Sequence, residues 1–175
     1  GLPIRHFPVD HSLFGACALG VETSRGWVLH TGDLRLHGGA SRATHSFVEE
    51  ARKLEPRALL CEGTRIGDQR HVSEAEVYEN ALRAVQATNG LVIADFGPRN
   101  VERLISFLRI AQETGRKLVI LGRDAYLLEA MRSVSAAVPD LAAHDDILIF
   151  QDMRVRLATW ERELLGRYQA KLSAR

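Results

Sequence analysis

Alternating apolar and polar residues near the start of the chain predict two β-strands joined by a tight turn. The strands cover residues 16–23 and 27–30, and Gly26 lies in the turn between them. Glycine suits the unusual backbone angle that such a turn requires. If this hairpin forms, its strand ends lie at one rim of a sheet, and His11 and Asp33 could meet there.

Helical spacing of apolar residues follows this hairpin. We expect helices over residues 47–54 and 77–85, with a short apolar strand at 58–61 between them. Each helix is preceded by a Ser-x-x-Glu sequence, led by Ser46 in the first case and by Ser73 in the second. This is the spacing of a capping box, which satisfies backbone N–H groups at the start of a helix.

From residue 91 the pattern changes to repeated strand–helix units. Short, continuously apolar runs indicate strands at 91–94, 118–121 and 147–150. Helical spacing follows each run, at 101–111, 124–131 and 157–165, with Asp124 as the expected cap of the middle helix. Apolar strands that alternate with amphipathic helices are typical of a parallel sheet covered on both faces. We therefore expect an α/β protein.

Composition restricts the class of protein without naming an activity. The 175 residues are 46% hydrophobic and 26% charged, as in ordinary globular proteins, and a net charge of +1 says little about partners. Cys17 and Cys61 lie in apolar runs, so we expect reduced core thiols. No apolar run approaches the ~20 residues needed to span a bilayer, and no secretory signal is visible. We expect a cytoplasmic protein without membrane association.

Three residues with ligand chemistry follow apolar strands: His11, Asp33 and Glu62. A neutral imidazole and a carboxylate suit zinc, and a carboxylate can bridge two ions. Taken singly, each residue has a more ordinary interpretation. A histidine beside an apolar strand is usually structural, an aspartate after Thr-Gly usually forms a turn, and a glutamate after a strand can cap a helix.

The wider sequence resembles a known family. Asp10-His11-Ser12 and His30-Thr31-Gly32-Asp33 resemble the third and fourth motifs of the metallo-β-lactamase nuclease superfamily. The resemblance is closest to its β-CASP branch, which includes ribonuclease J and the mRNA 3′-end-processing endonucleases. Glu62-Gly63-Thr64 resembles the acidic motif that opens the β-CASP region, although the family commonly has Ser where Gly63 stands. Further resemblances lie at residues 72–77, 94–103 and 115–123, and the spacing at 97–100 departs from the family pattern.

The resemblance implies a fold and a set of site residues. Residues 1–89 would form the second part of a metallo-β-lactamase αββα half, and residues 90–175 the start of a parallel-sheet β-CASP domain. His11 would bind one of two zinc ions, Asp33 would bridge both, and Glu62 would position a catalytic histidine supplied from later in the family's chain. The substrate would be RNA, and single-stranded RNA in particular.

Substrate contacts are expected from polar residues near the ends of strands. Ser12 neighbours His11, and the N-terminus of a helix at Asn100 could face a phosphate. Arg99, Arg103 and Arg123 lie near the carboxyl ends of the predicted strands, where open α/β sheets bind their ligands. The alternative is that these arginines are solvated surface charges or ion-pair partners.

Two elements of the family pattern are absent from the 175 residues. These are the His-x-His-x-Asp-His signature, which supplies most zinc ligands, and a late Gly-x-Gly-His histidine. We therefore expect an internal fragment without fully occupied zinc or nuclease activity of its own, and a homodimer is an open possibility. The alternatives are a small-molecule hydrolase of the same fold, a non-catalytic partner subunit, and a nucleotide-binding module, although no G-x-G-x-x-G or Walker A sequence occurs.

Overall fold

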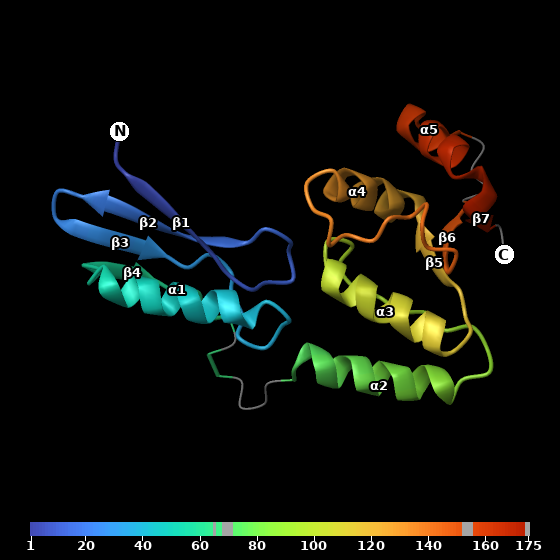
Figure 1. Cartoon of the computed structure of the whole chain (residues 1–175), viewed down its shortest axis with the longest axis horizontal. Helices are drawn as coiled ribbons and strands as arrows, with labels where there is room; N and C mark the ends of the chain where they lie inside the picture. The colour runs from blue at the N-terminus through green and yellow to red at the C-terminus, as the bar shows by residue number, and fades with distance from the viewer. Residues whose placement is uncertain (65, 68–71, 152–155, 174–175) are drawn as a thin grey trace. The chain divides into compact units, whose positions relative to one another are not determined.

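The computed structural model describes residues 1–64, 66, 67, 72–151 and 156–173. The chain divides into two compact units, Gly1–Glu79 and Asn80–Arg175, here called the first and second unit. The division falls inside helix α2 (Glu74–Gln86), whereas the sequence placed it after this helix, between residues 89 and 90. Figure 1 shows a sheet and helices in each unit.

The first unit contains a four-stranded mixed sheet in the order β1-β2-β3-β4. The strands are β1 (Ile4–Pro8), β2 (Cys17–Thr23), β3 (Gly26–His30) and β4 (Ala58–Leu60). The first three pair antiparallel, and β4 runs parallel to β3. The predicted hairpin is confirmed, because Thr23 pairs with Gly26 and Gly26 has a φ of 107°. Since β1, β3 and β4 run in the same direction, their carboxyl ends lie at one edge of the sheet.

Helix α1 (Ser41–Lys53) packs on one face of this sheet. Phe47 contacts Phe7 with ring centroids 5.5 Å apart. The predicted start of this helix at Ser46 is wrong, because the helix begins at Ser41 without a side-chain cap. Its first turn is held by tertiary contacts instead: the buried Thr44 hydroxyl bonds to loops outside the helix.

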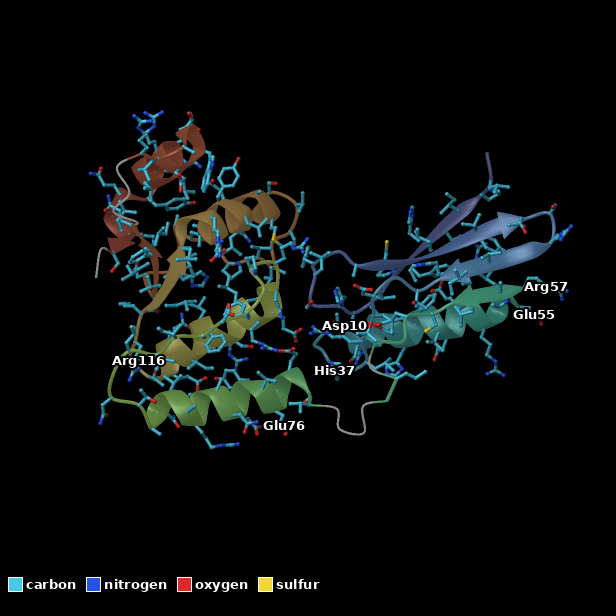
Figure 2. The ribbon with its side chains drawn as sticks, turned by 180° about the vertical axis from the view of Figure 1, so that it is seen from behind. Asp10, His37, Glu55, Arg57, Glu76 and Arg116 are labelled. Carbon is cyan, nitrogen blue, oxygen red and sulfur yellow. The ribbon has the colours of Figure 1, made fainter. Side chains whose placement is uncertain are left out.

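The expected capping of α2 by Ser73 is confirmed, because Glu76 N donates to Ser73 Oγ at 3.1 Å. Past the helix, Arg116 holds the following segment of the second unit by donating to the carbonyl oxygens of Thr88 and Gly90. Figure 2 labels this arginine. Ser73 therefore caps the start of α2, and Arg116 holds the segment that follows the end of α2.

The second unit contains a parallel sheet in the order β5-β6-β7. Its strands are β5 (Leu118–Leu121), β6 (Ile147–Phe150) and β7 (Leu172–Ser173). Its helices are α3 (Val101–Glu113), α4 (Gly122–Arg132), α5 (Thr159–Arg167) and the 3-10 helix η1 (Gln169–Lys171). The core contains apolar residues from α3, α4, α5, β5 and β6. The chain is thus an α/β protein, as predicted.

The expectation that this sheet is covered on both faces is wrong for the residues that the structure describes. Ile120, Ile147 and Ile149 are buried on one face. On the other, Leu121 and Phe150 keep 43% and 40% of their surface exposed. Alternation along a strand sends neighbouring side chains to opposite faces, so a uniformly apolar run does not show that both faces are covered.

Three further predictions are corrected. Residues 91–94 form no strand, and Leu91 and Ile93 are 86% and 85% exposed. An apolar run becomes a strand only where another strand accepts its backbone hydrogen bonds, and none of the described strands pairs with it. Asp124 lies in the first turn of α4, whose N-cap is Leu121. Cys17 and Cys61 are exposed rather than in the core. Neighbouring residues of a strand point to opposite faces, and in β2 it is Ala18, not Cys17, that faces the core.

No helix in the described part of the chain is long and apolar enough to cross a membrane.

The hydrophobic core of the second unit can be tested by a substitution. Leu128→Ala removes a fully buried side chain of α4 and should lower the free energy of unfolding by about 2–5 kcal/mol, because it leaves a cavity. The control is Leu91→Ala, which should change it by less than about 0.5 kcal/mol. Chemical denaturation followed by circular dichroism measures both. A comparable loss in Leu91→Ala would show that residues 91–94 are a buried strand after all.

Candidate functional site

The structure brings His11 and Asp33 together at one edge of the first sheet. His11 follows β1 and Asp33 follows β3, and these strands run in the same direction. His11 Nε2 lies 3.9 Å from Asp33 Oδ2, and the side chains are 28% and 74% exposed. Ser12 Oγ lies 3.5 Å from the same imidazole nitrogen. The imidazole and the carboxylate are therefore adjacent and open to a ligand.

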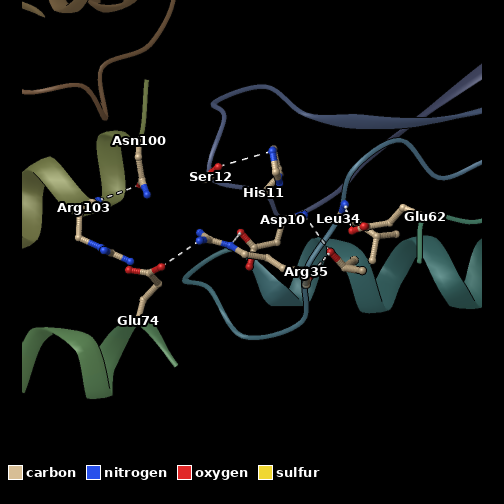
Figure 3. Close-up of polar contacts among 10 residues, drawn as sticks. Asp10, His11, Ser12, Leu34, Arg35, Glu62, Glu74, Asn100 and Arg103 are labelled. Atoms are coloured by element: carbon tan, nitrogen blue, oxygen red, sulfur yellow. Dashed lines mark hydrogen bonds and ion pairs between the residues drawn. The ribbon is translucent and has the colours of Figure 1, made fainter. Parts of the chain in front are cut away.

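Glu62 joins this edge from β4, which runs parallel to β3. Its Oε1 accepts a hydrogen bond of 3.1 Å from the backbone N–H of Leu34, and its own N–H donates to Thr31 Oγ1, also at 3.1 Å. Figure 3 shows Glu62 beside Leu34. The Leu34 N–H holds the pKa of the Glu62 carboxyl below its usual value, helped by Thr64 and by the nearby His11 and opposed by partial burial. Glu62 thus stands as a carboxylate against the loop that carries Asp33.

A buried network of charges underlies these three residues. Arg35 Nε donates to Asp10 Oδ1 and Arg35 Nη1 donates to Glu74 Oε1, both at 3.1 Å. The side chains of Asp10, Arg35 and Glu74 are only 2%, 9% and 11% exposed. Asp10 directly precedes His11, and Arg35 follows Asp33 by two residues. Figures 2 and 3 show Asp10 next to α1.

Backbone bonds reinforce the same junction. Arg35 N donates to Asp10 O at 2.8 Å. Thr44 Oγ1 accepts from Asp10 N at 2.8 Å and donates to Arg35 O at 3.0 Å. The loops that carry His11 and Asp33 are therefore tied to each other and to α1. From the sequence, Asp10 and Glu74 were named only as parts of longer motifs, and Arg35 was missed. The available signal for Asp10 was its position as a charged residue directly after the apolar run that ends at Val9.

The remaining predicted residues lie in the second unit. Arg99, Asn100 and Arg103 are grouped at the start of α3, and Asn100 Oδ1 caps this helix by accepting from Arg103 N at 3.0 Å. Figure 3 shows this cap. Arg123 lies in the first turn of α4, with its side chain 74% exposed and its Nε 3.7 Å from Asp124 Oδ1. Asn100 therefore has a demonstrated structural function at the position predicted to face a phosphate.

The donor set is small for a zinc site. His11 and Asp33 offer an imidazole nitrogen and carboxylate oxygens, both of which bind zinc. Zinc in catalytic sites commonly takes three protein ligands and a water. In the described ranges, no three His, Cys, Asp or Glu side chains are grouped so that they could hold a metal ion. These residues can contribute two ligands to a zinc shell but cannot complete it.

The chain is similar in sequence to parts of longer known proteins. No family model matches the chain. It is 29% identical over 134 residues to ribonuclease J of Mycolicibacterium smegmatis, 29% over 135 residues to that of Mycobacterium tuberculosis, and 27% over 130 residues to that of Mycoplasma pneumoniae. The chain is distantly similar to ribonuclease J. The matched regions cover 68–69% of this chain but only 22% of each relative.

A solved structure shares the fold. The crystal structure of a protein of unknown function from Enterococcus faecalis V583 superposes with a TM-score of 0.65 at 24% identity. The match covers 89% of this chain and 35% of the other. The arrangement of helices and strands described above therefore occurs inside a larger solved chain.

Gly38 tests the buried network. A Cβ at this position would collide with the guanidinium of Arg35 and with Asp10 Oδ2. Gly38→Ala should therefore lower the free energy of unfolding by about 1–3 kcal/mol, as overpacking does. Gly63→Ala is the matched control, because a Cβ there meets no atom of the described residues within 4 Å. Equal stability of the two variants, measured by chemical denaturation, would contradict the described packing.

Glu62 generates a pH-dependent prediction. Because its pKa in the folded state lies below the ordinary value of 4.5, the fold favours the ionised carboxylate. Its stabilising contribution is present above the unfolded-state pKa and is lost as the pH falls through the folded-state pKa. Glu62→Gln should lower the melting temperature at neutral pH, and the difference from the unaltered protein should shrink as the pH falls below 4.5 and the carboxylate takes up its proton.

The control for this experiment is Glu50→Gln, which changes an exposed carboxylate on α1. Thermal unfolding of all three proteins at several pH values measures the effect. If Glu62→Gln and Glu50→Gln give parallel pH profiles, Glu62 has no special link to the Leu34 backbone.

Proposed function

We propose that this chain is part of a ribonuclease related to ribonuclease J that hydrolyses phosphodiester bonds in RNA. The observation that carries the proposal is the 3.9 Å separation of His11 Nε2 and Asp33 Oδ2 at one sheet edge, with Glu62 bonded to the same loop. The distant similarity to three ribonucleases J supports it. In this proposal the parent protein has the metallo-β-lactamase and β-CASP architecture.

The proposed metal-binding residues are His11 and Asp33. His11 would bind one of two zinc ions and Asp33 would bridge both, with the other ligands supplied from outside these residues. Bound zinc would act as a Lewis acid and lower the pKa of a coordinated water. Glu62 would orient a histidine of the parent protein, since its carboxylate is already ionised and held by Leu34. The rigid junction of Asp10 and Arg35 would keep the His11 and Asp33 loops at a constant separation.

The proposed substrate is single-stranded RNA. Arg99, Arg103 and Arg123 would pair with phosphates through their guanidinium groups, and Ser12 would contact substrate beside His11. Asn100 would offer its amide N–H group, because its oxygen caps α3.

The decisive experiment replaces Asp33 by Asn in the polypeptide that contains this chain. We expect RNA cleavage to fall below detection, because an amide loses the charge and one of the oxygens needed to bridge two cations. The thermal unfolding curve should not change, since Asp33 is 74% exposed. The control is Asp146→Asn, which alters a half-buried carboxylate of the second unit paired with Lys117 at 2.8 Å and should leave cleavage intact.

Near-native cleavage by Asp33→Asn would remove the central assignment. Absence of cleavage by the unaltered parent would favour a non-catalytic subunit, and hydrolysis of thioesters or lactams in place of RNA would favour a small-molecule enzyme. We also expect the 175 residues alone to be inactive. Metal-dependent cleavage by them would show that their own ligands suffice.

A further inference from the structure

The second unit has a cavity of about 440 Å³ at the carboxyl ends of β5 and β6. Its lining includes Leu121, Arg123, Phe150, Leu157, Trp160 and Leu165. This is the size range of pockets for small organic ligands, and the carboxyl ends of parallel strands are where open α/β sheets bind ligands. Figure 1 shows α4 following β5, and α5 beyond β6, in this unit.

The wall of the cavity is apolar and partly aromatic. Leu121 and Phe150 come from the sheet face that the described helices leave partly open. Trp160 comes from α5, and its ring is supported by Tyr126, with centroids 5.0 Å apart at 49°. The indole therefore lines the cavity with a second aromatic ring packed against it.

Among the described residues, two charged side chains line the cavity, Arg123 and Glu161. Arg123 is 74% exposed and contacts Asp124 only through Nε at 3.7 Å among the interactions of the described residues. Leu121, the N-cap of α4, supplies no side-chain cap for the backbone N–H groups of the first turn. Glu161 also lines the cavity, but its Oε2 accepts a hydrogen bond of 2.8 Å from Ala158 N. The guanidinium of Arg123 near the aromatic side chain of Trp160 suits a ligand that contains both a planar ring and an anionic group.

We propose that this cavity binds one nucleotide of single-stranded RNA, with the base against Trp160 and a phosphate at Arg123. The inference rests on the proposed function and adds to it a subsite within the second unit. Base–aromatic stacking accepts every base, and the lining formed by the described residues is mostly apolar. The subsite is therefore tolerant of sequence, and its affinity decreases as salt screens the guanidinium.

The test uses the tryptophan content of the chain. Of the two tryptophans, Trp27 lies in the first unit, so the Trp27→Phe variant leaves Trp160 as the sole indole fluorophore. Titration with short oligouridylate and oligoadenylate should quench this fluorescence with similar affinities. An oligonucleotide with an abasic position at each residue, which retains the phosphates, should bind but leave the fluorescence unchanged.

Two substitutions test the residues. Arg123→Gln should weaken binding of a dye-labelled oligonucleotide by about tenfold at low salt, measured by anisotropy. Arg162→Gln removes the same charge from an exposed position on α5 outside the cavity and should have little effect. Trp160→Leu should weaken binding by about fivefold or more, because stacking is lost, and Trp160→Phe should restore most of it.

The outcomes separate this inference from the proposed function. If RNA binds with no change in Trp160 fluorescence and no effect of Arg123→Gln beyond that of Arg162→Gln, the subsite is wrong and the nuclease proposal stands. Failure of RNA to bind this chain, with cleavage by the parent intact, also overturns the subsite alone. Quenching by an apolar peptide but not by RNA would assign the cavity to a protein partner and overturn the proposal.

Discussion

The ion pair between Asp10 and Arg35 is the interaction on which the first unit depends. Both side chains are almost completely buried and meet at 3.1 Å, and Arg35 extends the pairing to Glu74. Removing one partner of such a pair typically costs about 3–5 kcal/mol, because the remaining charge stays buried without compensation. Asp10 Oδ2 has no hydrogen-bond partner among the described residues. The ion pair that Asp10 Oδ1 makes with Arg35 therefore compensates for much of the free energy that burying the carboxylate costs.

This ion pair gives the neighbouring surface residues a constant position. His11 and Asp33 are accessible to solvent, and each lies within two residues of a member of the pair. Glu62 reaches the same edge by a different route, because β4 runs parallel to β3 and delivers its carboxyl end there. A buried, fully packed foundation therefore supports an exposed group of ligands, which is the arrangement that precise positioning of a metal or phosphate requires.

Some of the fold could be predicted from local pattern. The β2–β3 hairpin follows from alternation and from Gly26, and the start of α2 follows from Ser73, because each depends on contacts within a few residues. The strands at 118–121 and 147–150 are likewise marked by short apolar runs between helices. The start of α1 could not be predicted in this way, because Thr44 is held by Asp10 and Arg35, which are distant in sequence. The strand predicted at residues 91–94 was wrong for the same reason, because a strand needs a neighbouring strand to pair with and the segment's own sequence does not specify one.

The sequence by itself determined the α/β class, the strand ends that carry His11, Asp33 and Glu62, and the residue types available for ligand chemistry. These three residues lie at one edge of the sheet because β1, β3 and β4 run in the same direction, and the sequence alone does not give the direction of the strands. The tertiary structure alone decided that Arg35 joins Asp10 to Glu74, that Asn100 caps a helix, and that Trp160 faces the same cavity as Arg123. The physical reason is that local pattern encodes backbone preference and the apolar face, whereas ion pairs and cavities form between segments brought together only by folding.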